Sequence, residues 1–226
     1  MIVNKFTVFS NEKASTMSAP SVQNMKLPDG RLYSGECKAG MPSGVGMAVY
    51  QSGNGYTGTW KEGREWGTGK VREDGITYEG DMSGGDGKSS ATIIDDLDTV
   101  YEGSTFNFTP HGTGVMRWQN CTSYTGSWVH GSMEGKGVSK ICTRMVHRGG
   151  YLNGKRHCAG RVVESNGTLY TGGWHKNSKQ GKGRELALDG SVFKGRWMND
   201  CKHGRASTKK TDGTVVASSW RHGHQL

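Results

Sequence analysis

Aromatic residues recur along the chain at a nearly constant interval. A ring two residues before a glycine begins each of eight units, at Tyr33, Tyr56, Tyr78, Tyr101, Tyr124, His147, Tyr170 and Phe193, and a broken ninth unit begins at Val216. The successive intervals are 23, 22, 23, 23, 23, 23, 23 and 23 residues. A period of this size indicates a tandem array of one supersecondary unit.

The pattern inside each unit predicts two strands. A unit reads Tyr-x-Gly-x-Trp-x-x-Gly-x-x-x-Gly-x-Gly and closes with Asp-Gly or Asn-Gly. Because strand side chains alternate, Tyr, Gly and Trp share one face of the first strand. Gly-x-Gly puts two bare positions on one face of the second strand, where large rings can lie flat. The Trp-x-x-Gly segment and the closing dipeptide supply the positive φ angles that hairpin turns require.

The sequence therefore predicts an all-β protein. We expect an elongated single-layer antiparallel sheet of about eight tandem hairpins with a period of 23 residues, plus a truncated ninth unit that cannot complete its hairpin. Each hairpin is stabilised mainly by its neighbours. Residues 27–226 form this array, whereas residues 1–26 break the period and are expected to be a tail that is flexible or docks on a partner.

Two parts of the array depart from the repeat. The departures are Met82 and Thr105 in place of Trp, Ser89 and Ala91 in place of Gly-x-Gly glycines, the acidic run Asp95-Asp96-Leu97-Asp98, and His147, Tyr151 and Cys158 in place of Tyr, Trp and Gly in the sixth unit. These departures either bend the ribbon, carry partner-specific contacts, or reflect neutral drift.

The unit resembles the MORN repeat (membrane occupation and recognition nexus). The resemblance covers residues 30–223 and rests on the aromatic, Trp and four Gly positions that hold phase, as in YTGTWKEGREWGTG from Tyr56 and YTGSWVHGSMEGKG from Tyr124. It implies a sheet grooved along one side, in which the groove receives helical or extended peptides. Similarity to radial-spoke-head and other cytoskeletal MORN scaffolds implies an axonemal or cell-cortex setting.

Composition is consistent with a folded repeat protein. Glycine makes up 37 of the 226 residues, but the 20 aromatic residues weigh against a disordered chain. Five cysteines without a Cys-x-x-Cys motif argue against a disulfide framework and a zinc site, and favour a reducing compartment. We expect an intracellular, cytoplasmic or cytoskeletal protein. A mitochondrial address is the alternative, because residues 1–20 are rich in Ser and Thr and carry Lys5 and Lys13 against Glu12.

The chain carries no convincing catalytic or cofactor motif. Gly53-x-Gly55-x-x-Gly58 matches a dinucleotide fingerprint only as a string, since no helical pattern follows it. Gly87-Lys88-Ser89 resembles the end of a P-loop whose first glycine is absent. His203 lies near Cys201, but two ligands do not make a zinc site. We expect no enzyme activity, no catalytic residues, no cofactor and no metal.

Aromatic side chains are the first candidate binding residues. The set comprises Tyr33, Tyr56, Trp60, Tyr78, Tyr101, Tyr124, Trp128, Tyr170, Trp174, Phe193, Trp197 and Trp220. These rings are either a ladder that stabilises the fold or the anchors of a partner-binding groove. Both roles can hold together.

The C-terminal part of the chain supplies the second candidate. Residues 1–135 carry 11 basic and 15 acidic side chains, whereas residues 136–226 carry 18 basic and 5 acidic ones. If the rings define one face, strand alternation puts Arg148, Lys194 and Arg196 on the other. Three more basic residues join them if the Gly-x-Gly glycines share the ring face: Lys136, Lys182 and Arg205. They form either an ordinary solvated face or a surface whose field attracts an acidic partner.

These features favour a non-enzymatic scaffold or spacer that binds other proteins within a large intracellular assembly. The expected partners are helical or extended segments, acidic protein surfaces, and a like or unlike chain at the C-terminal edge of the sheet. One alternative is a peripheral membrane tether that binds anionic phosphoinositides through the basic half. Another is a structural subunit of an organellar or ribonucleoprotein complex, although nucleic acid is the less favoured partner.

Overall fold

The computed structural model describes residues 21–83, 88–142 and 145–226. Within these ranges the chain forms 19 strands and no helix. The strands are β1 (Ser21–Lys26), β2 (Leu32–Lys38), β3 (Met41–Val49), β4 (Gly55–Lys61), β5 (Arg64–Glu73), β6 (Ile76–Asp81), β7 (Lys88–Ile94), β8 (Val100–Phe106), β9 (Thr109–Arg117), β10 (Thr122–Val129), β11 (Ser132–Ile141), β12 (Met145–Leu152), β13 (Lys155–Val163), β14 (Leu169–His175), β15 (Ser178–Leu186), β16 (Val192–Met198), β17 (Cys201–Lys209), β18 (Val215–Arg221) and β19 (His224–Gln225).

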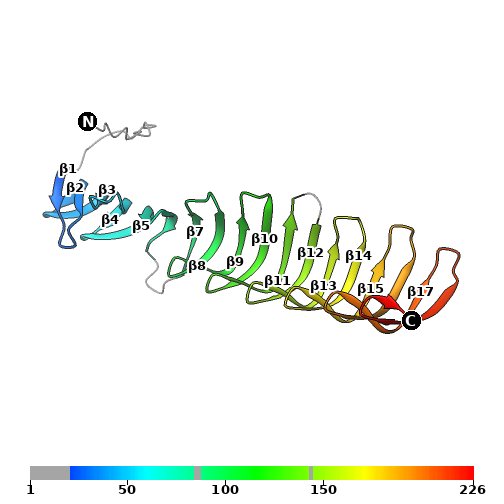
Figure 1. The fold of residues 1–226 in the computed structure, drawn as a ribbon. Helices are drawn as coiled ribbons and strands as arrows, with labels where there is room; N and C mark the ends of the chain where they lie inside the picture. The colour runs from blue at the N-terminus through cyan, green and yellow to red at the C-terminus, as the bar shows by residue number, and fades with distance from the viewer. Residues whose placement is uncertain (1–20, 84–87, 143–144) are drawn as a thin grey trace.

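Each strand pairs antiparallel with the next strand in sequence, from β1–β2 to β18–β19. The result is one open sheet, a single layer thick, that runs along the molecule as a row of hairpins (Figure 1). Substantial contacts join only strands that neighbour each other in this sheet. The predicted all-β, single-layer architecture is confirmed.

The turns use the residues that the repeat supplies for them. The two strands of a unit are joined by a two-residue turn in which both residues have positive φ, as at Glu62 (50°) and Gly63 (81°) between β4 and β5. This geometry matches the right-handed twist of the strands. Consecutive units are joined at the closing dipeptide, where Gly167 has a φ of 86°. The expected positive φ angles are present at both kinds of turn.

A β-bulge interrupts the pairing inside most hairpins. In β10–β11 the register shifts between Gly126 and Ser127, and the facing Gly135 has a φ of 62°. The first glycine of Gly-x-Gly is thus the left-handed residue of the bulge. The expectation that both glycines simply share a face beneath a ring was therefore wrong for the first one. Only the second glycine, Gly137 in this unit, lies under the tyrosine.

A ring resting on two glycines is the packing unit of the sheet. Tyr124 is fully buried, and its ring covers the backbone of Gly126 and Gly137 so closely that a Cβ on either would overlap it. Its hydroxyl donates a hydrogen bond to the carbonyl oxygen of Ser127 at 3.1 Å, beside the bulge. The same bond to the carbonyl three residues ahead is made by Tyr33, Tyr56, Tyr101 and Tyr170.

The rings of successive units form a continuous ladder. Edge-to-face contacts with centroids 4.9 to 5.7 Å apart link, in order, Tyr101, Trp128, Tyr124, Tyr151, His147, Trp174, Tyr170, Trp197, Phe193 and Trp220. A separate block near the N-terminus joins Trp60 to Tyr33 and Tyr56. We call these rings the ring ladder. They supply the buried apolar surface that a single-layer sheet otherwise lacks.

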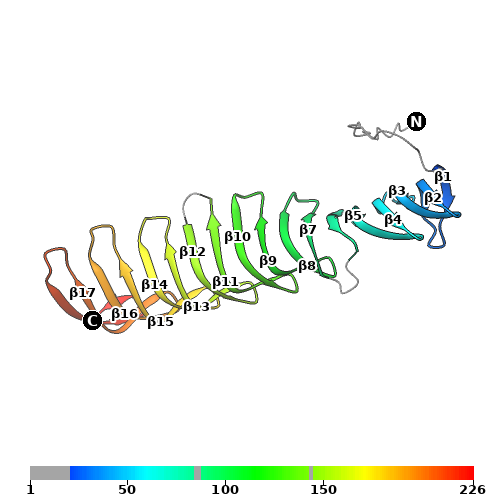
Figure 2. The ribbon, with the colours of Figure 1, turned by 180° about the vertical axis from the view of Figure 1, so that it is seen from behind.

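The ladder is interrupted where tryptophan is missing. Thr105 occupies a Trp position, and its Oγ1 lies 2.7 Å from the Oγ of Ser89 on the neighbouring strand. Tyr78 is only half-buried and contacts Phe108 instead of a tryptophan. From β7 onward the hairpins stand in a regular row, whereas β1–β5 are turned relative to that row (Figures 1 and 2). The change of direction coincides with the interrupted ladder.

The two ends of the sheet differ from the expectation. Ser21–Lys26, assigned above to the tail, form β1 and pair with β2, so the sheet begins six residues before the expected boundary of the array. Residues 1–20 lie outside the described part of the chain. The ninth unit was expected to leave its hairpin incomplete, but a turn at His222–Gly223 pairs His224 with Arg221. The short strand β19 therefore closes that hairpin.

Replacing Gly137 with alanine tests the ring-on-glycine packing. The new Cβ would overlap the Tyr124 ring, so we expect a loss of about 2–3 kcal/mol in the free energy of unfolding. Gly181→Ala is the matched control, because that position has open space and only a positive φ of 77°. It should cost about 1 kcal/mol. Urea unfolding of both variants measures the difference, and equal losses would contradict the proposed packing.

Candidate binding surface

The aromatic residues proposed for a partner groove are mostly the core of the sheet. Ten of the twelve are between 0% and 4% exposed: Tyr33, Tyr56, Trp60, Tyr101, Tyr124, Trp128, Tyr170, Trp174, Phe193 and Trp197. Tyr78 and Trp220 are half-buried. Burial raises the pKa of the Tyr124 hydroxyl to about 12. A partner could reach the ten buried rings only if the sheet rearranged, so the geometry assigns them to the fold.

Several cations on the ladder side are also used by the fold. The guanidinium of Arg156 lies 4.2 Å from the Trp174 ring centre. Lys179 lies 4.9 Å from the Tyr170 ring centre and pairs with Glu164 at 2.6 Å. Such cation–π contacts are attractive, most of all for desolvated groups. Both cations are therefore held in contacts within the sheet, and are not the best candidates for binding an external anion.

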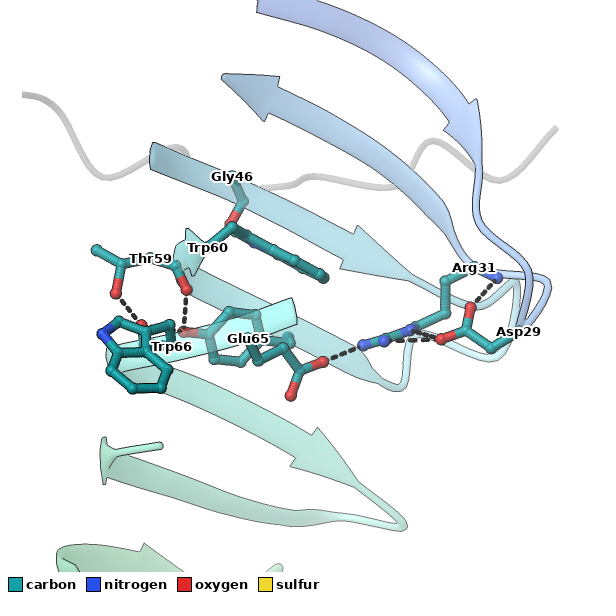
Figure 3. A network of polar contacts seen from close by, with 8 residues as sticks. Asp29, Arg31, Gly46, Thr59, Trp60, Glu65 and Trp66 are labelled. Atoms are coloured by element: carbon teal, nitrogen blue, oxygen red, sulfur yellow. Dashed lines mark hydrogen bonds and ion pairs between the residues drawn. The ribbon is translucent and has the colours of Figure 1, made fainter. Parts of the chain in front are cut away.

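Arg31 is likewise held by ring contacts and ion pairs near the N-terminal end of the ladder (Figure 3). Its guanidinium bonds Asp29 at 2.7 Å and Glu65 at 2.5 Å, and its carbon lies 5.8 Å from the Trp60 ring centre. The hydrogen bond from Arg31 lowers the pKa of Asp29, while burial opposes that shift. In the same view Trp60 donates its indole N–H to the carbonyl of Gly46 at 3.2 Å. The network ties the ladder to the turn before β2.

Basic side chains line up on the opposite face of the sheet. Backbone pairing sets Arg148 of β12 against Arg161 of β13, and Arg184 of β15 against Lys194 of β16. Thr171 of β14 pairs with both Arg161 and Arg184 and completes the line. We call the four charged residues the basic row. It crosses five strands at right angles to them, so its members recur about every 4.8 Å.

Four further cations lie beside the basic row: Lys136, Lys182, Arg196 and Arg205. Lys182, Arg196 and Arg205 join Arg184 and Lys194 around an open hollow of about 490 Å³. Lys136 and Arg148 border a second hollow of about 660 Å³. All eight cations are exposed, and none pairs with an acidic side chain in the described part of the chain.

The six basic residues proposed from the sequence therefore share one exposed face with Arg161 and Arg184. Sequence reasoning missed these two, although both directly follow the second glycine of a Gly-x-Gly or its equivalent, Gly160 and Gly183. Each lies one alternation step beyond the residue between the two Gly-x-Gly positions, as Arg184 lies two residues after Lys182. Both residues lie in the regularly paired part of the second strand, beyond the bulge, where strand alternation continues.

The sixth unit replaces the usual tyrosine with a buried histidine. His147 is 1% exposed, and its Nδ1 lies 2.9 Å from the hydroxyl of Tyr151, which donates to Ser139 Oγ at 2.7 Å. Burial, assisted by the nearby Arg156 charge, lowers the pKa of His147 to about 4. The imidazole is therefore neutral at pH 7. It fills the ladder position without the hydroxyl–carbonyl bond of the tyrosines.

Neither a metal site nor a membrane-spanning helix is found in residues 21–83, 88–142 and 145–226. In these ranges no three His, Cys, Asp or Glu side chains gather as a metal site requires. No helix there is long and apolar enough to cross a bilayer.

Comparisons with known proteins leave the family of this chain open. No family model matches the sequence, and no curated protein matches it. Among solved structures, the chain is similar to the TCP domain of SAS-4 (dCPAP) of Drosophila melanogaster, in a complex with a proline-rich motif of Ana2 (dSTIL). The TM-score is 0.41 at 9% identity, over 94% of this chain and 99% of that one. A TM-score this low does not establish a common fold, so the match supports no inference about partners.

Truncating Trp174 tests whether the ladder rings are structural. This ring contacts both His147 and Tyr170, so Trp174→Ala should lower the free energy of unfolding by about 3–5 kcal/mol. Trp220→Ala is the control, because that ring is half-buried at the end of the ladder and contacts only Phe193 among the ladder rings. Thermal unfolding followed by circular dichroism should show a much smaller loss for it. A Trp174→Ala protein of unchanged stability would mean that the ring is available to a partner.

His147 gives the sheet a predicted pH dependence. Its folded pKa of about 4 lies below the ordinary value of 6.5, so the unfolded chain binds the proton more readily. Its contribution is fully present above pH 6.5 and is lost as the pH falls toward 4, at most about 3 kcal/mol in all. His147→Phe, which copies Phe193 in the equivalent position, should remove this slope. His224→Gln, at an exposed site, should keep it, and urea unfolding at several pH values compares the three proteins.

Proposed function

We propose that the chain is a non-enzymatic scaffold that binds other proteins through the face opposite the ring ladder. The observation that carries this proposal is the set of eight exposed cations on that face, which have no acidic partner among the described residues. In residues 136–226 basic side chains outnumber acidic ones by 13. A concentrated field of one sign raises the association rate of an oppositely charged partner.

The architecture supports a spacer role. Backbone pairing joins each hairpin to its neighbours, and the ring ladder packs hairpins together on both sides of its interruption. The sheet therefore extends through 19 strands in the described residues as one layer. At about 4.8 Å per strand, such a sheet is on the order of 85 Å long. Its open face is long enough to hold more than one partner segment at a fixed separation.

We further propose a cytoskeletal setting, either axonemal, as in radial-spoke heads, or cortical. This part rests on the resemblance of the repeat to MORN units and on nothing in the geometry.

The five Tyr, Trp and Phe rings of β11–β17 are all buried. Single-stranded nucleic acid binds by stacking on exposed rings, so the ribonucleoprotein alternative draws less support from this surface than a protein partner does.

A peripheral membrane tether is the second candidate, because the same eight cations would attract anionic phosphoinositides. Flotation with phosphatidylcholine vesicles containing phosphatidylinositol bisphosphate separates the two functions. A scaffold should stay unbound at physiological salt, whereas recovery with the vesicles would favour the tether.

Charge reversal on the basic row tests the proposed binding face. Arg161→Glu combined with Arg184→Glu should reduce partner recovery at least tenfold in crosslinking and mass spectrometry from native cell extract, because the field at the surface is reversed. The matched control is Lys38→Glu with Arg64→Glu, which changes the net charge equally at two exposed positions in the N-terminal part. Equal recovery by both double variants would reject this face, and the identity of the recovered proteins would test the cytoskeletal setting.

A further inference from the structure

The exposed face carries a second row that the sequence pattern does not reveal. Backbone pairing aligns one apolar residue from each of five consecutive strands, β12 to β16: Val146, Val163, Leu169, Leu186 and Val192. We call these five residues the apolar row. Each lies two residues along its strand from a member of the basic row or from Thr171. The two rows therefore lie on the same face, about 7 Å apart.

Within residues 21–83, 88–142 and 145–226, no second layer covers the apolar row. Its members are partly exposed, and Val163 is 40% exposed. Each of β12–β16 makes substantial contacts only with its neighbours in the sheet. An apolar strip flanked by unpaired cations thus faces outward over five strands. Exposed apolar strips bounded by polar groups commonly mark interaction sites.

We propose that the apolar and basic rows together bind an amphipathic α-helix of a partner protein, laid across β12–β16. The apolar stripe of that helix packs on the apolar row, and an adjacent stripe of Asp and Glu meets the basic row. This inference rests on the proposed protein-binding function and specifies the partner's chemistry. It assigns a place to five apolar residues that the ring ladder does not use.

The spacing of the rows fits a helix better than an extended chain. Strands recur every 4.8 Å or so and helical turns every 5.4 Å, so one turn meets one strand with a drift of roughly 0.6 Å per step. Alternate residues of an extended segment recur about every 6.7 Å and fall out of register after two strands. The five strands span about 19 Å, which corresponds to about 13 helical residues.

The footprint also matches the width of one helix. The rows are each one side chain wide and about 7 Å apart, whereas a helix with its side chains is about 10–12 Å across. Apolar anchors beside charged residues are the usual recognition pattern for a helix lying in a groove. The apolar contacts provide affinity, and the charged row fixes the direction and register of the helix.

A designed peptide pair tests this inference on the full chain. The first peptide is a fluorescent helix of about 18 residues with one Leu stripe and one adjacent Glu stripe. The second has the same composition, reordered so that neither stripe exists. Fluorescence anisotropy should give at least tenfold tighter binding for the striped peptide. Equal binding of the two peptides would overturn the proposal, because attraction by charge alone does not depend on the stripes.

Variants of both rows complete the test. Arg184→Glu and Leu186→Gln should each weaken striped-peptide binding at least tenfold, and Val163→Gln offers a second apolar-row variant if Leu186→Gln lowers the urea midpoint. The Lys38→Glu/Arg64→Glu control should bind like the unaltered protein. If only Arg184→Glu has an effect, the surface binds acidic chains without the apolar row, and the helix proposal fails.

The failure of this inference can be told apart from failure of the proposed function. Crosslinks from native extract to Lys182 and Lys194 that map to an extended partner segment would overturn the helix while keeping the protein-binding scaffold. Vesicle flotation weakened equally by Arg184→Glu and Leu186→Gln would overturn both, because the two rows would then serve a lipid surface. Crosslinks to an acidic helical segment would support both.

Discussion

The whole structure depends on a ring lying flat on two glycines of neighbouring strands. A single-layer sheet has no second layer to bury apolar surface, so each hairpin has to carry its own core. Tyr124 does this by covering Gly126 and Gly137 and bonding the carbonyl of Ser127 at the bulge. The bulge leaves some backbone groups without a hydrogen bond to the neighbouring strand, and the tyrosine hydroxyl bonds one of these groups. The ring, the two glycines and the bulge therefore depend on one another, and a change in any of them affects the whole contact.

This interaction makes the two faces of the sheet unequal. Positions on the same face as the ring are packed by the next unit, and nearby cations such as Arg156, which lies over Trp174, take part in that packing. Positions on the other face touch no second layer formed by the described part of the chain. They can change without cost to the ladder, so net charge can build up there. The contrast between the neutralised Lys179 and the unpaired Lys182, three residues apart, follows from this inequality.

The fold could be predicted from the sequence because the ring, glycine and turn positions repeat in fixed phase. The placement of Lys136 and Arg148 on an exposed face also followed from strand alternation. Other features depended on cross-strand register, which no single unit contains. The bulge at Gly135 shifts the pairing of the second strand by two residues, and Val163 becomes a neighbour of Leu169 only through pairing. The burial of the rings depended on neighbours too, since four tryptophans each contact rings of two units: Trp60, Trp128, Trp174 and Trp197.

The departures from the repeat produce local differences in packing and direction along the sheet. Where Thr105 replaces tryptophan, a hydroxyl pair with Ser89 substitutes for an aromatic contact, and the sheet changes direction nearby.

In the sixth unit the ladder continues through His147, although Cys158 then takes the left-handed bulge position at a φ of 59°, where other units have glycine. A side chain in that conformation is strained. The array tolerates this strain because the rings on both sides, Tyr151 and Trp174, still hold the unit in line. A change on the ladder face thus alters shape or local stability, whereas a change on the open face alters what the sheet can bind.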